Sequence, residues 1–184
     1  SFPARVHFPE VEALTGEGRS RPGHFGGVGT VLTKLFAWVR PDVAVFGQKD
    51  ALQCVVVRRL AADFFPDMRV EVHPTAREAD GLAMSSRNKR LAPDERARAP
   101  HVYRTLCAVE AAVRAGASTI EEALADGVAY AKAHGVELEY LEANDMDTWQ
   151  PVSGALRTGQ DVCVSIGVSV GPSTRPIDNI LLTA

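Results

Sequence analysis

Residues 80–88, Asp-Gly-Leu-Ala-Met-Ser-Ser-Arg-Asn, place two adjacent hydroxyl side chains directly before a guanidinium. Arginine presents a rigid fork of donors that matches phosphate oxygens, and serine hydroxyls and backbone N–H groups add donors without bulk. Ser85, Ser86 and Arg87 are therefore candidate phosphate ligands. A Ser-Ser-Arg triplet also fits an ordinary solvated loop, so the segment needs support from elsewhere in the chain.

A lysine stands in a predicted strand-to-helix turn further upstream. Residues 43–46, Val-Ala-Val-Phe, predict a short strand buried on both faces, as in a parallel sheet. Gly47 would let the chain turn and a ligand approach, and Asp50 occupies the N-cap position before an apolar-periodic run. Lys49 would then project from the carboxyl end of a strand, where open α/β sheets bind ligands. The alternative is a solvated lysine beside a capping aspartate.

The elements around this turn predict a small parallel sheet. Apolar residues at helical spacing predict helices over residues 28–39 and 50–64, and alternation predicts a strand over residues 69–72. A helix–strand–helix–strand order is typical of parallel sheets with crossover helices. Residues 1–27, which carry Gly and Pro throughout, predict loop with at most one short strand.

Residues 80–88 are called here the phosphate segment. After it, the predicted elements change from a parallel sheet with helices to helices followed by an antiparallel sheet. A helix is predicted from about residue 91, restarted at Pro100 and ended at Gly116, and another is predicted over residues 118–134. Three strands joined by turn-rich segments predict an antiparallel sheet, over residues 137–143, 161–170 and 177–182. The predicted class is α/β: a partial Rossmann-like parallel sheet with N-terminal strands missing, then a smaller α+β domain with helices and a three-stranded antiparallel sheet. We expect the domains to cover residues 1–78 and 79–184.

Composition excludes several classes of protein. The chain has 184 residues, 46% hydrophobic and 23% charged, with a net charge of −3. These values are ordinary for a globular protein and give no reason to expect a nucleic acid or an anionic membrane as partner. The cysteines are dispersed and lack metal-site spacing, which favours buried free thiols in a reducing cytosol: Cys54, Cys107 and Cys163.

Four segments together resemble the pantothenate synthetase family, a branch of the nucleotidyltransferase superfamily with a Rossmann-like ATP site. They are residues 21–28 (Arg-Pro-Gly-His-Phe-Gly-Gly-Val), 46–50 (Phe-Gly-Gln-Lys-Asp), 77–88 (Arg-Glu-Ala followed by the phosphate segment) and 177–179 (Ile-Asp-Asn). The resemblance covers essentially the whole chain. Gln48 departs from the family's Glu and removes one negative charge beside the lysine.

The resemblance implies a ligase of coenzyme A biosynthesis that uses ATP with Mg²⁺. Pantoate would attack the α-phosphorus of ATP, releasing pyrophosphate and giving pantoyl adenylate. The amine of β-alanine would then attack the acyl carbon, releasing AMP and pantothenate. The resemblance also implies a cytoplasmic homodimer whose C-terminal domain is a lid.

The resemblance assigns four residues to the catalytic set. Lys49 would neutralise charge at the α-phosphate in both steps. Ser85, Ser86 and Arg87 would hold the β- and γ-phosphates and then the pyrophosphate. Such groups suit a reaction that relies chiefly on positioning and on stabilising charge spread over oxygens.

The remaining ATP and pantoate contacts are implied in the same way. Gly47 and Asp50 would contact the ribose, and Gln53, one helical turn further on, would hydrogen-bond pantoate. Backbone near Ala76 and the Met84 side chain would line the adenine pocket, although plain core packing fits Met84 equally well. For His24 two roles stand open, closure of the pantoate end of the site or a loop hydrogen bond, and we favour the second.

One family segment has no counterpart here. The family begins with Met-Gly-x-Leu-His-x-Gly-His, whose histidines contact the ATP phosphates, and we therefore expect this chain to correspond to the C-terminal portion. The alternative is a truncated, non-catalytic nucleotide-binding or dimerisation fragment. Another nucleotidyltransferase with a different acceptor is a third reading, which Gln53 and the length of the match disfavour. No protein ligand is assigned to the metal.

Overall fold

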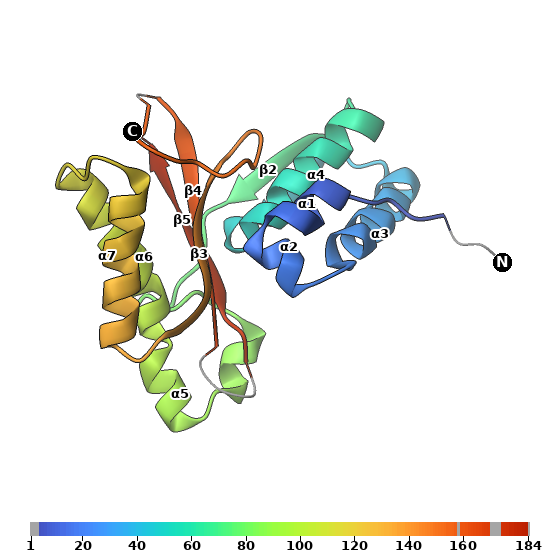
Figure 1. The fold of residues 1–184 in the computed structure, drawn as a ribbon. Helices are drawn as coiled ribbons and strands as arrows, with labels where there is room; N and C mark the ends of the chain where they lie inside the picture. Colours follow the sequence, from blue (N-terminus) through green and yellow to red (C-terminus); the bar gives the residue numbers. More distant parts are fainter. Residues whose placement is uncertain (1–3, 158, 170–173, 184) are drawn as a thin grey trace. The chain divides into compact units, whose positions relative to one another are not determined.

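The structure is a computed structural model that describes residues 4–157, 159–169 and 174–183. The chain forms two compact units, Ser1–Pro74 and Thr75–Ala184, called here the first and the second unit (Figure 1). The first holds a parallel pair of strands and the second a three-stranded antiparallel sheet. Both sheets were predicted from the sequence, and the mixed α/β class is confirmed.

The first unit places helices on a two-stranded sheet. Strand β1 (Val43–Gly47) pairs in parallel with β2 (Arg69–His73), with Val43 opposite Arg69 and Gly47 opposite His73. A short 3-10 turn, η1 (Gln48–Asp50), and helix α4 (Ala51–Phe64) connect the two strands. Helix α3 (His24–Val39) packs against α4, and the shared core contains Phe36, Ala44, Val57 and Leu60.

The prediction of loop over the first 27 residues is wrong. The described part of that stretch, residues 4–27, contains α1 (Pro9–Leu14), α2 (Gly16–Ser20) and the first turn of α3, and no strand. Helix α1 begins with a proline and two acidic residues in its first turn, and the Thr15 side chain caps α2 by accepting from the Gly18 N–H at 2.8 Å.

Helix α3 begins four residues earlier than predicted because its cap comes from another helix. The Glu12 carboxylate of α1 accepts hydrogen bonds from the N–H groups of Gly23 and Gly26, each at 3.2 Å. Gly29 of this helix is needed for packing, since a Cβ added there would lie 2.5 Å from the Phe8 ring. The Glu12 carboxylate and the Phe8 ring, both distant in sequence, therefore stabilise a start of α3 that local spacing does not indicate.

The apolar surface of the first unit is only partly covered within the described residues. Strand β1 buries Ala44 but leaves Val45 58% exposed, so the prediction of a strand buried on both faces is wrong. The reason is that the helices of this unit pack on the face that carries Ala44 and Phe46. On α3 the apolar residues at helical spacing are also only partly covered, since Phe36 is buried while Val31 is 52% and Val39 is 68% exposed.

The described part of the second unit contains three helices and an antiparallel sheet, and two of the helices, α6 and α7, pack on the sheet. After the 3-10 turn η2 (Ser86–Arg90) come three helices, α5 (Pro93–Arg98), α6 (Pro100–Arg114) and α7 (Ile120–Ala133). The strands follow as β3 (Glu137–Asp145), β4 (Asp161–Ser169) and β5 (Ile177–Thr183), in the order β3-β4-β5. The predicted end of the second strand, Val170, lies outside the described residues.

Helices α6 and α7 lie side by side against one face of this sheet, as Figure 1 shows. Their contact with the sheet forms a core in which Leu106, Ile120 and Ile166 are fully buried. Both helices end close to where the sequence predicts, each two residues before a glycine with positive φ, Gly116 (93°) for α6 and Gly135 (67°) for α7, and the restart at Pro100 is confirmed. Across the parts of the chain that the structure describes, no helix is long and apolar enough to cross a membrane.

All three cysteines are free thiols, as the sequence predicts. Cys54 and Cys163 are buried, whereas Cys107 is only partly buried. Burial raises the pKa of the Cys54 thiol to about 11, so this group is protonated at neutral pH. The expectation of full burial is therefore wrong for Cys107 alone.

Candidate functional site

The strand-to-helix turn of the first unit has the local structure that the sequence predicts. Strand β1 ends at Gly47, Lys49 lies half-buried in η1, and Asp50 occupies the N-cap position of α4. The Cys54 thiol donates to the Gly47 carbonyl oxygen at 3.4 Å and so ties the first turn of α4 to the end of the strand. Gln53 lies half-buried in the same helical turn.

Gly47 and Asp50 differ in local structure from what the sequence predicts. Gly47 has φ −89° and ψ 134°, an extended backbone that any residue adopts, so the turn does not need glycine. Nothing lies within 4 Å of a Cβ added there, which leaves open space beside the backbone for a ligand. Asp50 makes no capping hydrogen bond to α4 through its side chain, so its carboxylate is not committed to the helix.

His24 shares the electrostatic environment of this turn. Burial lowers its pKa below the ordinary value of 6.5, and the positive charge of Arg21 lowers it further. The carboxylates of Glu17, Asp50 and Glu12 oppose that shift. The ring also meets Phe25 edge-on, with centroids 5.0 Å apart. His24 is thus a neutral imidazole at pH 7 within electrostatic range of Asp50, a closeness that sequence spacing does not reveal.

We expect the His24 imidazole to titrate below pH 6.5 in the folded protein. Because the folded state binds this proton less tightly than the unfolded state, its contribution to stability is present above pH 6.5 and is lost as the pH falls toward the folded-state pKa. An NMR titration of the ring Cε1–H measures the midpoint, and a His24→Gln variant identifies the signal. A midpoint at or above 6.5 would contradict the burial argument.

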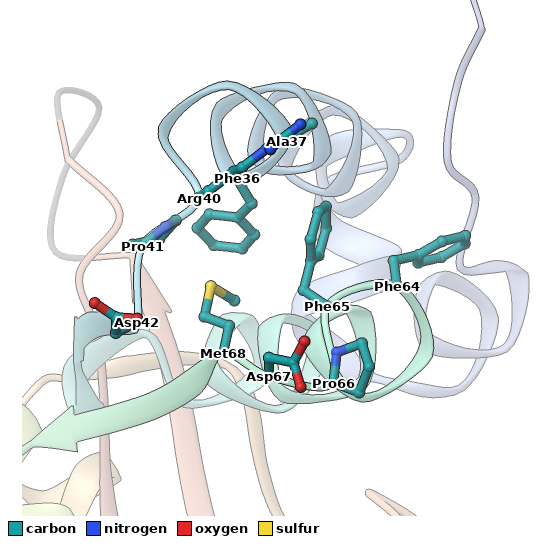
Figure 2. Close-up of a pocket in the computed structure, with 10 residues that line it drawn as sticks. All are labelled: Phe36, Ala37, Arg40, Pro41, Asp42, Phe64, Phe65, Pro66, Asp67 and Met68. Carbon is teal, nitrogen blue, oxygen red and sulfur yellow. The ribbon is translucent and has the colours of Figure 1, made fainter.

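A pocket of about 440 Å³ lies at the amino-terminal end of the parallel strands β1 and β2, opposite the end that carries Gly47. Pro41 and Asp42, which precede β1, and Met68, which precedes β2, line it, and Phe36 and Phe65 point into it (Figure 2). The two phenylalanine rings meet edge to face, with centroids 5.5 Å apart. Ligands of open α/β sheets bind beyond the carboxyl ends of the strands, so this apolar pocket is not the predicted phosphate site.

The phosphate segment forms a turn with a buried base and an exposed end. The Ala76 carbonyl oxygen accepts from the Met84 N–H at 2.9 Å, and Leu82 and Ala83 are buried. The Ser85 hydroxyl oxygen accepts from the Arg87 N–H at 3.2 Å and caps η2. Ser86 and Arg87 are exposed. A base that is fixed and an end that presents a hydroxyl and a guanidinium suit the binding of an anion.

Met84 does not belong to the core. Its side chain is 57% exposed, which makes plain core packing the wrong interpretation. Exposure of a large apolar side chain next to candidate phosphate ligands fits a surface that a ligand covers, although single exposed apolar residues are common. The adenine contact assigned to Met84 and to the backbone near Ala76 stays a prediction.

Charged side chains hold the base of the phosphate segment from two sides. The Arg77 guanidinium makes two hydrogen bonds to the Asp178 carboxylate, at 2.6 and 3.1 Å. On the other side, Arg96 reaches Asp80 at 2.6 Å and Glu78 at 2.8 Å. The Arg96 guanidinium holds the pKa of the Asp80 carboxyl below its usual range, because it donates a hydrogen bond to the charged form.

Sequence reasoning missed these two contacts for different reasons. Arg77 and Asp178 both lie in segments that carry the family resemblance, but they are 101 positions apart, and no spacing rule joins them. Arg96 lies in a short predicted helix, where an exposed arginine is the usual expectation. The one sequence signal for the Arg77–Asp178 contact was Asp178 itself, an acidic residue within the otherwise mainly apolar C-terminal strand.

The predicted site residues divide between the two units. The first unit contains Gly47, Lys49, Asp50 and Gln53, which the β1–α4 connection brings together. The second unit contains the rest, which the phosphate segment brings together: Ala76, Met84, Ser85, Ser86 and Arg87. No group of three His, Cys, Asp or Glu side chains within the described ranges is arranged to hold a metal ion.

Comparison with known proteins agrees with this architecture. The family model described as pantoate-beta-alanine ligase matches residues 2–181. A pantothenate synthetase of Pseudomonas entomophila (strain L48) is 44% identical over 179 residues, which cover 97% of this chain and 60% of that protein. A bifunctional pantoate ligase/cytidylate kinase of Synechocystis sp. is 43% identical over 166 residues, 90% of this chain and 32% of that protein.

Solved structures with a similar fold are also pantothenate synthetases. A crystal structure of pantothenate synthetase from Thermus thermophilus matches with a TM-score of 0.87 at 39% identity, over 97% of this chain and 63% of that one. The pantoate-beta-alanine ligase of Francisella tularensis, complexed with beta-gamma ATP and beta-alanine, matches with a TM-score of 0.70 at 27% identity, over 97% and 58%.

Fold and sequence together define a mixed α/β chain related to ligases of small carboxylic acids. The chain belongs to the pantoate-beta-alanine ligase family. It spans 60% of the length of the Pseudomonas relative and 63% of the Thermus structure.

Proposed function

We propose that this chain contributes to the ATP-dependent condensation of pantoate with β-alanine. The observation that carries the proposal is the family match over residues 2–181. In the first step a pantoate carboxylate oxygen bonds to the α-phosphorus of ATP, and the bond to the bridging oxygen breaks to release pyrophosphate. In the second step the β-alanine amine bonds to the acyl carbon, loses a proton, and displaces AMP. Pantothenate is the product.

The residue roles follow from the chemistry of each group. Lys49 would neutralise charge at the α-phosphate, and the Ser85 hydroxyl with Ser86 and Arg87 would hold the β- and γ-phosphates and the departing pyrophosphate. The half-buried Gln53 would hydrogen-bond pantoate from the first turn of α4. These are positioning and charge-neutralising groups, which is what transfer of a nucleotidyl group needs.

The remaining ATP contacts are proposed on the same basis. The open backbone at Gly47 and the Asp50 carboxylate would contact the ribose, and Ala76 with the exposed Met84 would line the adenine. We further propose that residues 1–78 serve as the C-terminal part of an ATP- and pantoate-binding domain and residues 79–184 as a lid. Mg²⁺ would arrive bound to the ATP phosphates, which need a hard cation. A cytoplasmic homodimer completes the proposal.

The test uses the gene product expressed from its own start codon. Incubated with pantoate, β-alanine, ATP and Mg²⁺, it is expected to form pantothenate and AMP in equal amounts, as measured by liquid chromatography and mass spectrometry. Without β-alanine it should exchange labelled pyrophosphate into ATP only when pantoate is present. Formation of ADP in place of AMP would exclude the adenylate route. Exchange supported equally by a panel of other hydroxy acids would point to a different acceptor.

A second candidate function, nucleotide binding or self-association without turnover, has two observations in its favour. The chain covers 58–63% of the solved relatives, and its sequence has no His-x-Gly-His segment. The 184-residue chain by itself would then bind nucleotide without turnover, or only associate with a copy of itself. Pantothenate formation by this chain alone, in the same assay, would exclude that reading.

A further inference from the structure

We propose that the Arg77–Asp178 ion pair is a positioning device for the phosphate segment, acting through Ser85, Ser86 and Arg87. The proposal rests on the function proposed above. It gives a role to the Ile-Asp-Asn segment of β5, which none of the ATP or pantoate contacts uses. All of its residues belong to the second unit.

The geometry of the pair is highly constrained. The two guanidinium nitrogens of Arg77 donate to both Asp178 oxygens, and they also reach the carbonyl oxygens of Gly81 at 3.1 Å and Asn179 at 3.4 Å. The guanidinium carbon lies 3.6 Å from the centre of the Tyr103 ring. Only a planar fork of donors satisfies two carboxylate oxygens while it stacks on an aromatic face.

Burial makes the pair difficult to rearrange. The Asp178 side chain is only 2% exposed, and that of Arg77 is 20% exposed. One Asp178 oxygen also accepts from the Asn179 N–H at 2.8 Å. A buried carboxylate without its cation is strongly unfavourable, so the pair holds Arg77 in one place.

Arg77 in turn fixes the backbone that leads into the binding residues. It pairs with Ala83 in an antiparallel bridge, and the adjacent Ala76 carbonyl oxygen accepts from the Met84 N–H at 2.9 Å. Ser85 follows directly. Between the two sides, Gly81 turns with φ +94°, and a Cβ there would lie 2.8 Å from the Tyr103 ring. The turn thus packs on the same ring as the guanidinium.

A second clamp holds the other end of the segment. The Asn88 side chain donates to Glu78 at 2.8 Å and to the Ala83 carbonyl oxygen at 3.1 Å. Glu78 also accepts from Arg96. The exposed Ser86 and Arg87 are therefore fixed on both sides through backbone and side-chain contacts. Groups held in place before the ligand arrives lose less conformational entropy on binding it.

Matched conservative substitutions test the pair. Arg77→Lys keeps the charge but loses the fork, and Asp178→Asn keeps the shape but loses the charge. Each is expected to weaken the affinity for ATP and to raise KM for ATP by about tenfold, because the loosened segment must then be ordered when ATP binds. KM for β-alanine should stay unchanged. Arg114→Lys is the control, because Arg114 forms an exposed ion pair with Glu110 in the same unit.

Two further readouts separate positioning from a merely structural role. Amide hydrogen exchange should speed up over residues 83–88 in both variants and stay unchanged in α6. The double variant Arg77→Lys/Asp178→Asn should lose no more ATP affinity than either single one, because the residues act as one unit. Losses that multiply, or faster exchange with unchanged ATP affinity, would overturn the proposal.

The design also separates this proposal from the proposed function. Titration calorimetry with ATP needs no turnover, so it decides the positioning role even if the wild-type protein forms no pantothenate. A wild type that binds ATP but makes no pantothenate would refute the proposed reaction alone. Variants that bind ATP as tightly as the wild type would refute the positioning role alone.

Discussion

Replacement of Lys49 by Ala is expected to lower kcat/KM for pantoyl-adenylate formation by about a thousandfold. Negative charge increases on the α-phosphate oxygens as the pantoate carboxylate attacks, and a lysine fixed in the η1 turn would stabilise that charge without reorganisation. Alanine removes the charge and leaves water in its place. Pantoate-dependent exchange of pyrophosphate into ATP, measured with the full gene product, reports this step directly.

Two variants make the Lys49 experiment specific. Lys34→Ala is the same change on α3 in the same unit, away from the β1–α4 turn in sequence, and it should leave exchange unchanged. Lys49→Arg keeps a positive charge on a bulkier head group and should recover part of the loss. Turnover of the Lys49→Ala variant within a fewfold of wild type would remove the lysine from the proposed catalytic set.

The β1–α4 connection could be predicted because every signal for it is local. Pro41 ends the preceding helix, four apolar residues make the strand, and Asp50 stands at the N-cap of α4. The helices at the start of the chain could not be predicted in the same way. Their determinants are the cap that Glu12 supplies to α3 and the close contact of Phe8 with Gly29, and both join positions that are distant along the chain.

The same distinction applies to the candidate site. Ser85, Ser86 and Arg87 stand out as candidates because hydroxyl and guanidinium groups adjacent in sequence suit phosphate oxygens, although the triplet by itself also fits a solvated loop. The side chains that hold them do not stand out, since Arg77 contacts Asp178 only through the tertiary structure, in which β5 pairs with β4. Candidate ligand groups can thus be proposed from residue type, whereas the contacts that hold them depend on the tertiary structure.

The second large effect is expected on the stability of the second unit. Leu106→Ala should lower its free energy of unfolding by about 3 kcal/mol, through lost burial and the cavity left behind. Leu106 is fully buried where α6 packs on the sheet. Helices α6 and α7 are already in tight contact, because a Cβ added at Gly127 of α7 would lie 2.5 Å from Val109 of α6. They therefore cannot move closer together to fill the cavity.

The matched control is Leu181→Ala, the same change at a β5 position that is 44% exposed. It should cost less than about 1 kcal/mol, because little apolar surface leaves water there on folding. The chain has two tryptophans, and Trp149 is 5% exposed in the second unit while Trp38 is 78% exposed in the first. In a Trp38→Phe background, fluorescence during denaturant unfolding therefore reports on the second unit alone. Equal shifts of the midpoint for the two leucine variants would mean that the α6–sheet core does not govern the stability of this unit.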